Sequence, residues 1–108
     1  MSFAKLVRNK VPDLLRNGGA NPVTHRAGPA ERRLRLYERL REEVGSFLAK
    51  DSDIFAIDEL ADVQEVIRAL CAAHGATLKE LEQRRVAKSK SHGTFSEWIV
   101  WTGDGGGV

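Results

Sequence analysis

Two long stretches in the middle of the chain carry apolar residues at helical spacing. The first runs from residue 29 to about residue 50, and its apolar positions are Leu36, Leu40, Val44, Phe47 and Leu48. The second is closed by Gly75, and its apolar positions are Ile54, Ile57, Leu60, Ala61, Ile67, Leu70 and Cys71. Steps of three and four residues are typical of an amphipathic helix. Because only Asp51-Ser52-Asp53 separates them, we expect these two helices to pack antiparallel.

A shorter helix is predicted before this hairpin. Pro12 favours a helix start, and Asn17, followed by two glycines, favours its end. We expect residues 20–28 to form a loop, with a short extended piece at 23–25.

A further helix is predicted after the hairpin, because Thr77 and Glu80 form a capping-box pattern. The aromatic and β-branched residues of 94–102 favour either a short strand or an apolar strap. The sequence therefore predicts an all-α fold: an antiparallel helical hairpin core with shorter helices and, as an option, a C-terminal strand. Residues 1–102 are expected to form a single helical domain, and residues 103–108 a flexible tail.

Composition is that of an ordinary globular protein, but the charge is unevenly distributed. The 108 residues fit one domain, with 42% hydrophobic residues, 30% charged residues and a formal net charge of +2. Residues 1–41 hold ten Lys or Arg against three Asp or Glu, whereas residues 42–82 hold three against ten. This asymmetry fits two arrangements: mutual attraction within the fold, or an acidic metal centre ringed by cations for phosphate.

Several other kinds of protein are disfavoured. Cys71 is the only cysteine, so no internal disulfide forms, and we expect it to be a small buried residue. The N-terminus lacks a signal-like apolar region and no stretch approaches membrane-spanning length, so a cytoplasmic protein with no membrane partner is expected. The arginines of residues 32–41 would suit a nucleic-acid-binding helix. A solvated face, or pairing with the acidic region, explains them better, so a nucleic-acid partner is not expected.

We expect the histidines and tryptophans to have structural roles. The three histidines show no zinc spacing, and His74, just before Gly75, is expected at a helix C-terminus, where it favours the dipole. Trp98 and Trp101 are expected to pack in the core or at a subunit interface rather than to stack on a base.

Both helices of the predicted hairpin carry acidic residues. Glu42 and Glu43 lie on the first, and Glu59, Asp62 and Glu65 lie near one face of the second because they are three residues apart. Carboxylates this close repel one another, and a bound divalent cation removes that repulsion. Magnesium prefers oxygen ligands and commonly joins one or two carboxylates to substrate phosphates. The alternative is a solvated acidic face, or carboxylates paired with arginines, namely Arg33, Arg35 or Arg68.

Four segments carry a resemblance to a known family. In order along the chain they are Lys5-Leu-Val-Arg-Asn-Lys-Val-Pro12, Leu40-Arg-Glu-Glu-Val-Gly-Ser-Phe47, Asp58-Glu-Leu-Ala-Asp-Val-Gln-Glu-Val-Ile67 and Gly93-Thr-Phe95. Together they resemble the all-α nucleoside triphosphate pyrophosphatases, a superfamily that includes MazG-like proteins and phosphoribosyl-ATP pyrophosphohydrolase. Its small house-cleaning members begin with a K-L-V-R-D-K-I-P-like stretch, which the first segment resembles.

The resemblance implies a helical enzyme, dimeric or tetrameric, that uses Mg²⁺ (with Mn²⁺ as the alternative). Such an enzyme hydrolyses a nucleoside triphosphate, non-standard nucleotides included, to the monophosphate and pyrophosphate. The implied catalytic residues and metal ligands are Glu43, Glu59 and Asp62. The implied phosphate-binding residues are Arg8 and Lys10 and, with weaker support, Lys88 and Lys90.

The chain departs from the family motif on the first long helix. Where the motif has a second glutamate, this chain has Ser46, preceded by Gly45. A neutral hydroxyl is a poor magnesium ligand. Either Glu42 or Glu65 compensates, or a water bridges Ser46 to the metal, or the site is weakened and the chain is a catalytically impaired nucleotide-binding or scaffolding homologue. Gly45 costs helix stability and suggests close approach of another helix or a ligand.

A second departure is Asn9, which stands where the N-terminal stretch usually has aspartate. It removes any carboxylate role from that position.

Overall fold

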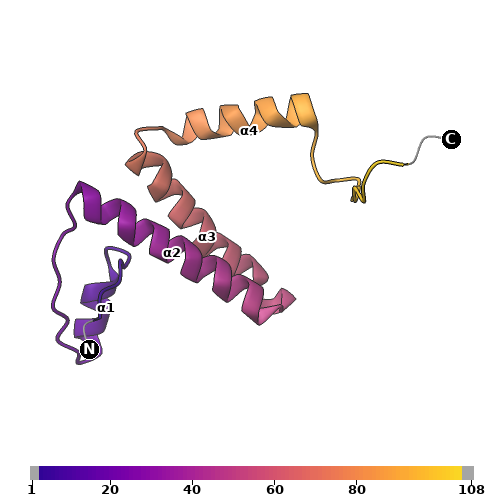
Figure 1. Ribbon diagram of the computed structural model, residues 1–108. Helices are drawn as coiled ribbons and strands as arrows, with labels where there is room; N and C mark the ends of the chain where they lie inside the picture. Colours follow the sequence, from indigo (N-terminus) through magenta and orange to yellow (C-terminus); the bar gives the residue numbers. More distant parts are fainter. Residues whose placement is uncertain (1–2, 106–108) are drawn as a thin grey trace. The chain divides into compact units, whose positions relative to one another are not determined.

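The computed structural model describes residues 3–105, and this part of the chain contains helices and no strand (Figure 1). The helices are, in order, α1 (Val11–Asn17), α2 (Pro29–Lys50), α3 (Asp53–Ala73) and α4 (Leu78–His92). The predicted all-α class is therefore confirmed. Of the predicted C-terminal tail, residues 106–108 lie outside the described residues.

The chain divides into two compact units, Met1–Leu78 and Lys79–Val108. The first contains the hairpin and the N-terminal segment, and the second contains most of α4 and the residues after it. The single domain expected over residues 1–102 stays a prediction.

The long helices begin and end where their sequence signals lie. Pro29 opens α2, and Asp51 ends it in the left-handed region with a φ of 39°. His74 follows α3 as its C-cap, as expected, and Gly75 then takes a φ of 76°, which favours glycine.

The helices α2 and α3 pack against each other as the predicted hairpin, and Figure 1 shows them side by side. The residues that this packing buries are Leu36 and Glu43 on α2 and Glu59 and Val66 on α3. Only two of these four are apolar. The seam between the helices therefore consists of a small hydrophobic contact beside a pair of buried carboxylates.

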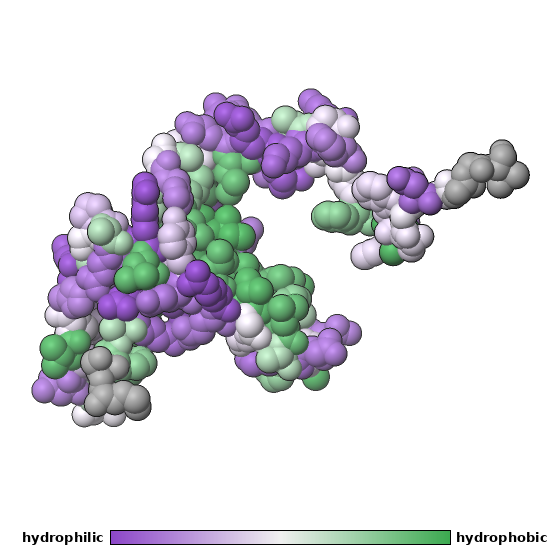
Figure 2. All heavy atoms as spheres, in the orientation of Figure 1, coloured by the Kyte–Doolittle hydropathy of each residue, from purple (hydrophilic) through white to green (hydrophobic). Residues whose placement is uncertain are grey.

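The hairpin has two unlike faces on either side of this seam. A residue that follows a buried one lies about 100° further round its helix, and these residues are Tyr37, Val44, Leu60 and Ile67. Because the helices run antiparallel, the same rotation turns all four to one side, where each is between 38% and 44% exposed. We call this side the apolar face, and Figure 2 shows hydrophobic residues gathered along the hairpin.

The residues that precede the buried ones are Arg35, Glu42, Asp58 and Glu65. By the same reasoning they turn to the opposite side, which we call the polar face. One helical pattern therefore separates an uncovered apolar surface from the surface that carries the acidic residues.

The C-terminal apolar segment does not form a strand. Residues 94–102 instead contain a turn, in which the backbone N–H of Trp98 donates to the carbonyl of Phe95 at 3.1 Å. Trp98 and Trp101 are 84% and 83% exposed, so the residues of their own unit do not bury them, and packing elsewhere, including at a subunit interface, stays a prediction. The turn does not bring enough neighbouring chain around either ring to cover it.

Residues 20–28 form the expected loop, and the extended piece at 23–25 stays a prediction. Two smaller expectations are corrected. Cys71 is half-buried, and its thiol lies 3.1 Å from the Thr77 carbonyl oxygen. A Cβ added at Gly45 would meet open space, so close approach of another element does not explain that glycine.

No described helix is both long and apolar enough to cross a lipid bilayer.

Candidate metal centre

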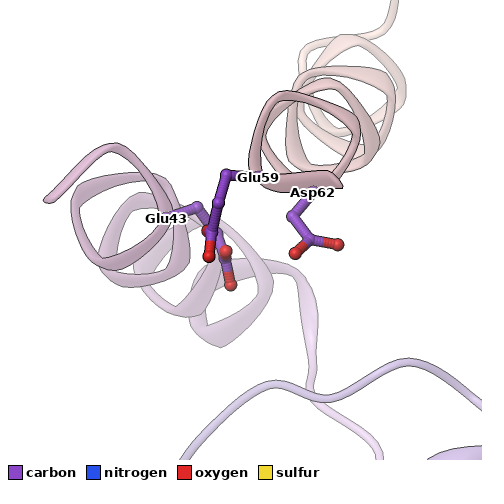
Figure 3. Close-up of side chains that lie close together, drawn as sticks. All are labelled: Glu43, Glu59 and Asp62. Atoms are coloured by element: carbon purple, nitrogen blue, oxygen red, sulfur yellow. The ribbon is translucent and has the colours of Figure 1, made fainter. Parts of the chain in front are cut away.

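Three of the predicted ligands meet at the seam of the hairpin. Glu43 comes from α2, and Glu59 and Asp62 come from α3 (Figure 3). Each offers a carboxylate oxygen, and these three oxygens lie within 4.8 Å of one another. We call this set the carboxylate cluster.

The antiparallel packing explains why these residues meet. Glu43 and Glu59 are both at the buried seam, where they are 8% and 7% exposed. Asp62 lies three residues after Glu59, so it projects from nearly the same side of α3, one turn further along. Because Asp62 is turned toward the polar face, the cluster is buried at one end and open to solvent at the other.

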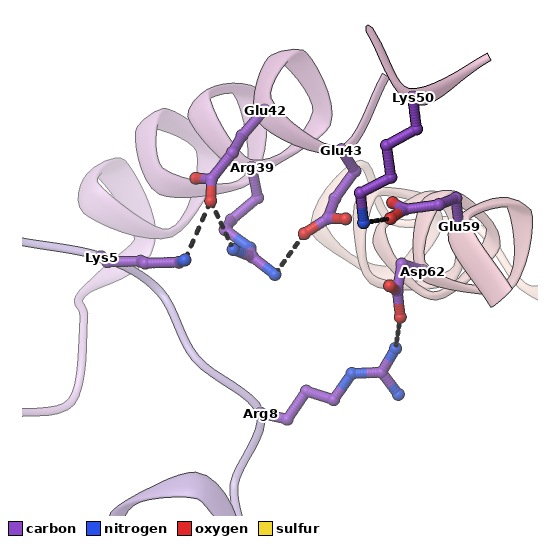
Figure 4. A network of polar contacts seen from close by, with 8 residues as sticks. All are labelled: Lys5, Arg8, Arg39, Glu42, Glu43, Lys50, Glu59 and Asp62. Carbon is purple, nitrogen blue, oxygen red and sulfur yellow. Dashed lines mark hydrogen bonds and ion pairs between the residues drawn. The ribbon is translucent and has the colours of Figure 1, made fainter. Parts of the chain in front are cut away.

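Each carboxylate of the cluster has its own cation from elsewhere in the chain (Figure 4). The guanidinium of Arg39 lies 2.6 Å from Glu43, and that of Arg8 lies 2.8 Å from Asp62. Lys50, at the end of α2, pairs with Glu59. Three cations therefore balance the three carboxylates, and they come from the N-terminal segment, the middle of α2 and the end of α2.

The pKa values at the buried end reflect this pairing. The hydrogen bond from Lys50 holds the pKa of Glu59 below its ordinary value, and the Ser46 hydroxyl lowers it further. In return, Glu59 raises the pKa of Lys50, with smaller contributions from the nearby charges of Asp62 and Glu43. The pair is ionised at neutral pH, so Glu59 is in the form that a metal ion requires.

Ser46 lies beside the carboxylate cluster. Its hydroxyl contacts Glu59, where a glutamate would add a fourth carboxylate. Ser46 is therefore a neutral group at the edge of the cluster.

Glu42 and Glu65, the two acids that would compensate, are not among the three that meet. Glu42 is 2.9 Å from Lys5 and 3.2 Å from Arg39, and Lys5 is the main cause of its lowered pKa. Glu65 is in a long ion pair, 3.9 Å, with Arg68. Both therefore lie on the polar face outside the carboxylate cluster.

The predicted phosphate-binding residues come from both compact units. Arg8 reaches the cluster through Asp62, whereas Lys10 is exposed at the N-cap of α1. Lys88 and Lys90 lie on α4 in the second unit. For all four residues, the role in binding phosphate stays a prediction from the sequence.

The arginines expected to pair with the acidic residues mostly bind other groups. Arg33 donates to the carbonyl of Ala73 at 3.2 Å, and Arg35 pairs with Glu31 and Glu38. Of the three, only Arg68 pairs with an acid of the predicted set, Glu65.

Only some of the cations that pair with the cluster have a signal in the sequence. Arg39 lies four residues before Glu43 on the same helix. This spacing favours an ion pair, so the contact could have been predicted from the sequence. Lys50 reaches Glu59 across the turn between the helices, and no sequence spacing reveals that contact. Lys5 approaches Glu42 from the N-terminal segment, which depends on tertiary folding alone.

The cluster fits a hard divalent cation. Such ions take carboxylate oxygens, and Mg²⁺ ligands at about 2.1 Å stand up to about 4.2 Å apart across the ion. Oxygens within 4.8 Å of one another need only small side-chain movements to meet this requirement. The described chain brings no cysteine or histidine into the set, so a soft or zinc-type site is disfavoured.

Comparisons of this chain with family models, with curated proteins and with solved structures found no match. The family resemblance read from the sequence therefore stays a prediction.

Proposed function

We propose that this chain is a metal-dependent hydrolase of the all-α nucleoside triphosphate pyrophosphatase type, similar to MazG-like proteins. Its reaction would convert a nucleoside triphosphate to the monophosphate and pyrophosphate. The observation that carries the proposal is the meeting of Glu43, Glu59 and Asp62, from two antiparallel helices, within 4.8 Å. Arg8 at the open end of the cluster adds a cation where a polyphosphate would approach.

The three carboxylates would hold Mg²⁺, with Mn²⁺ as the alternative. A divalent ion held by these residues would supply Lewis-acid chemistry, polarising a phosphoryl oxygen and lowering the pKa of a nearby water. Arg8 would leave its ion pair with Asp62 and bind a phosphate of the substrate instead. Its planar guanidinium suits phosphate oxygens. In the overall reaction, water adds to the α-phosphorus, the bond from that atom to the bridging oxygen breaks, and pyrophosphate leaves with the electron pair.

A pyrophosphate-release assay across standard and damaged nucleoside triphosphates, with Mg²⁺ and with Mn²⁺, tests this proposal. Wild-type protein is expected to turn over at least one of them, and Asp62→Asn is expected to remove that activity. Turnover that Asp62→Asn leaves unchanged, or no turnover with any substrate, would contradict it.

A second candidate function keeps the fold without the chemistry. Ser46 favours it, because the hydroxyl supplies no charge where the motif has a carboxylate. The chain would then bind a nucleotide and its metal without cleaving it. Calorimetry with Mg²⁺ and a non-hydrolysable triphosphate distinguishes the two, since binding without any pyrophosphate release supports only this second function.

The apolar face supports the homo-oligomer expected from the sequence. Leu48 and Ile57 extend it at the turn end of the hairpin and are 68% and 75% exposed. A two-helix hairpin with two buried apolar side chains is too small a core to be stable alone. A second copy brings an identical apolar face, and packing the two would form a four-helix arrangement with the polar faces outward.

A further inference from the structure

We infer that residues 94–102, which we call the strap, dock on the apolar face of a second copy of this chain, at the turn end of its hairpin. Each copy would then hold the other with a C-terminal arm made of α4 and the strap. The inference does not depend on the hydrolase chemistry. It rests on the homo-oligomer proposed above and adds a second contact to it.

The strap carries five large apolar side chains that its own unit does not cover. They are between 80% and 92% exposed, and they are Phe95, Trp98, Ile99, Val100 and Trp101. All five belong to the compact unit Lys79–Val108. A contiguous exposed apolar patch is typical of an interaction site.

The backbone of the strap also indicates a partner. Trp98 has a φ of 56°, in the left-handed region that bulky side chains disfavour. A 3.1 Å hydrogen bond from its backbone N–H to the carbonyl of Phe95 closes this turn. One exposed hydrogen bond stabilises a turn only weakly, so contacts with another surface would help to hold it.

The charge of the strap's unit favours a protein surface over a lipid bilayer as the partner. Residues 79–108 hold five Lys or Arg against four Asp or Glu, and two of these acids, Glu97 and Asp104, flank the tryptophans. An anionic bilayer attracts clusters of four to eight cations, and acidic side chains oppose that attraction. An apolar protein surface with a cation at its edge fits the strap better.

The hairpin presents such a surface at its turn end. Leu48 and Ile57 are 68% and 75% exposed, whereas the residues in the middle of the apolar face are between 38% and 44% exposed. Packing two apolar faces together covers the middle first. We therefore expect the turn end to remain available for the strap.

Arg41 and Glu97 give this contact its charge complementarity. Arg41 lies four residues after Tyr37 and three before Val44, so it borders the apolar face. Glu97 directly precedes Trp98 in the strap. Both residues are exposed, and neither is in an ion pair within the part of the chain that the structure describes. An arginine beside the apolar face and a glutamate within the strap can therefore pair when the two surfaces meet.

The composition of α4 favours a second copy over the arm's own hairpin. From Glu82 to its end at His92, this helix has one large apolar residue, Val86, so it lacks an apolar stripe with which to lie along α3. A helix that is polar all round commonly bridges separate bodies. Its 15 residues extend about 22 Å, which is enough to carry the strap to a neighbouring copy.

The area that the strap can bury suits a stable dimer. A covered aromatic side chain buries about 150–250 Å², so the three aromatic side chains of one strap would bury roughly 450–750 Å². A two-fold dimer has two such straps. Together they approach the roughly 1,200–2,000 Å² of stable interfaces before the packing of the helices is counted.

Charge reversal tests the contact and shows whether it joins two copies. Arg41→Glu or Glu97→Arg alone should raise the dimer dissociation constant about tenfold, because two like-charge contacts replace two attractive ones. Both substitutions in the same chain should restore it. An equimolar mixture of the two single variants should also restore dimers, since the arm of each copy then meets an opposite charge on the other. Sedimentation equilibrium measures every case.

Asp104→Arg is the matched control for charge. It reverses an exposed acid of the same unit outside the strap, so combining it with Arg41→Glu should restore nothing. Recovery as large as that given by Glu97→Arg would mean that net charge alone sets the association, and this overturns the inference. Recovery in the double variant without recovery in the mixture places the contact within one chain and also overturns it.

Tryptophan fluorescence provides a second measurement, on the wild type. The chain has two tryptophans and both are in the strap, so their emission reports the cover of the strap alone. The emission of the dimer should be blue-shifted, and dilution to monomer should shift it to the red. Leu48→Glu, which places a charge in the docking surface, should shift it to the red at the dimer concentration.

The remaining outcomes separate this inference from the proposals above. A dimer whose tryptophans emit as in water overturns the inference while the homo-oligomer stands, and a wild-type monomer overturns both. A blue shift that appears only with phosphatidylserine vesicles assigns the strap to a membrane and overturns the inference. The pyrophosphate-release assay decides the hydrolase proposal independently of all of these.

Discussion

Lys50, the last residue of α2, forms an ion pair with Glu59, on the second turn of α3. Only Asp51 and Ser52 separate the two helices, so this pair spans the turn of the hairpin. It joins the ends of the two helices and also places a cation against the buried end of the carboxylate cluster. The stability of the hairpin and the charge of the candidate site are therefore linked through one contact.

This pair predicts a pH dependence of the free energy of unfolding. The pKa of Glu59 is lowered from 4.5, so its contribution is present above about pH 4.5 and is lost as pH falls through the lowered value. The pKa of Lys50 is raised from 10.5, so its contribution is present below about pH 10.5 and is lost as pH rises through the raised value. Urea unfolding over a pH series measures both losses.

Lys50→Met is the variant that checks this assignment. Without the ammonium group, the pKa of Glu59 should return toward its ordinary value, and both the acid and the alkaline loss should become smaller. If Lys50→Met unfolds with the same pH profile as the wild type, the pair does not contribute to stability as we expect.

Gly45→Ala is expected to stabilise the protein by about 0.5–1 kcal/mol. Gly45 is exposed in the interior of α2, has no positive φ, and a Cβ there meets nothing. Alanine would therefore lose less backbone entropy on folding without any clash. Gly75→Ala is the control and should be destabilising, since Gly75 has a φ of 76°. Chemical denaturation of the two variants should shift the midpoint in opposite directions.

Ser46→Glu is expected to make the protein more dependent on the metal. Residue 46 contacts Glu59, so the new carboxylate would repel the cluster in the absence of a cation and join it in the presence of one. In EDTA the melting temperature of the variant should be lower than that of the wild type. Adding Mg²⁺ should raise the melting temperature of the variant by more than that of the wild type. If Ser46 cripples the wild-type enzyme, turnover should also rise strongly. Equal responses of both proteins to Mg²⁺ would show that position 46 lies outside the metal site.

Arg8→Ala is expected to separate metal binding from phosphate binding. The Arg8–Asp62 pair is exposed, so its loss should cost no more than about 1 kcal/mol of stability. Freed of its competing cation, Asp62 should bind Mn²⁺ more tightly, whereas KM for the triphosphate should rise. Arg16→Ala is the matched control, because it removes an exposed ion pair with Asp13 on α1, outside the carboxylate cluster. Calorimetry with Mn²⁺ and steady-state kinetics provide the two readouts.

Leu60→Glu is expected to disrupt the homo-oligomer. It places a charge in the middle of the apolar face, where a second copy would have to bury it. Sedimentation should show the wild type as a dimer or larger and the variant as a smaller species. Ile54→Glu is the control. Ile54 lies on the same helix and is 85% exposed, but it is on the polar side with Asp58, so a charge there should leave the assembly intact. A wild-type monomer at micromolar concentration would refute this arrangement.

The sequence predicted the long helices well because their signals are local. Pro29, the turn at Asp51 and Gly75 each set a helix end through backbone preferences that act within a few residues. The meeting of Glu43 with Glu59 follows from the antiparallel hairpin, so the core of the candidate site could also be anticipated.

The partners of the site could not be anticipated in the same way. Arg8 reaches the cluster, and Lys5 reaches the neighbouring Glu42, from a segment without helical periodicity, and Lys50 reaches Glu59 by folding back across the turn. These contacts depend on the path of the chain in space. The strand option for residues 94–102 was wrong because β propensity alone does not supply a pairing strand.

The balance of charges in the carboxylate cluster has a consequence for the order of binding events. Glu43, Glu59 and Asp62 already have cations from the same chain, so an arriving divalent ion must replace Arg39, Lys50 or Arg8 rather than fill a vacant negative site. The displaced cations then need new anions, and a triphosphate supplies them. Metal and polyphosphate are thus expected to bind with positive cooperativity, each strengthening the other by the same factor.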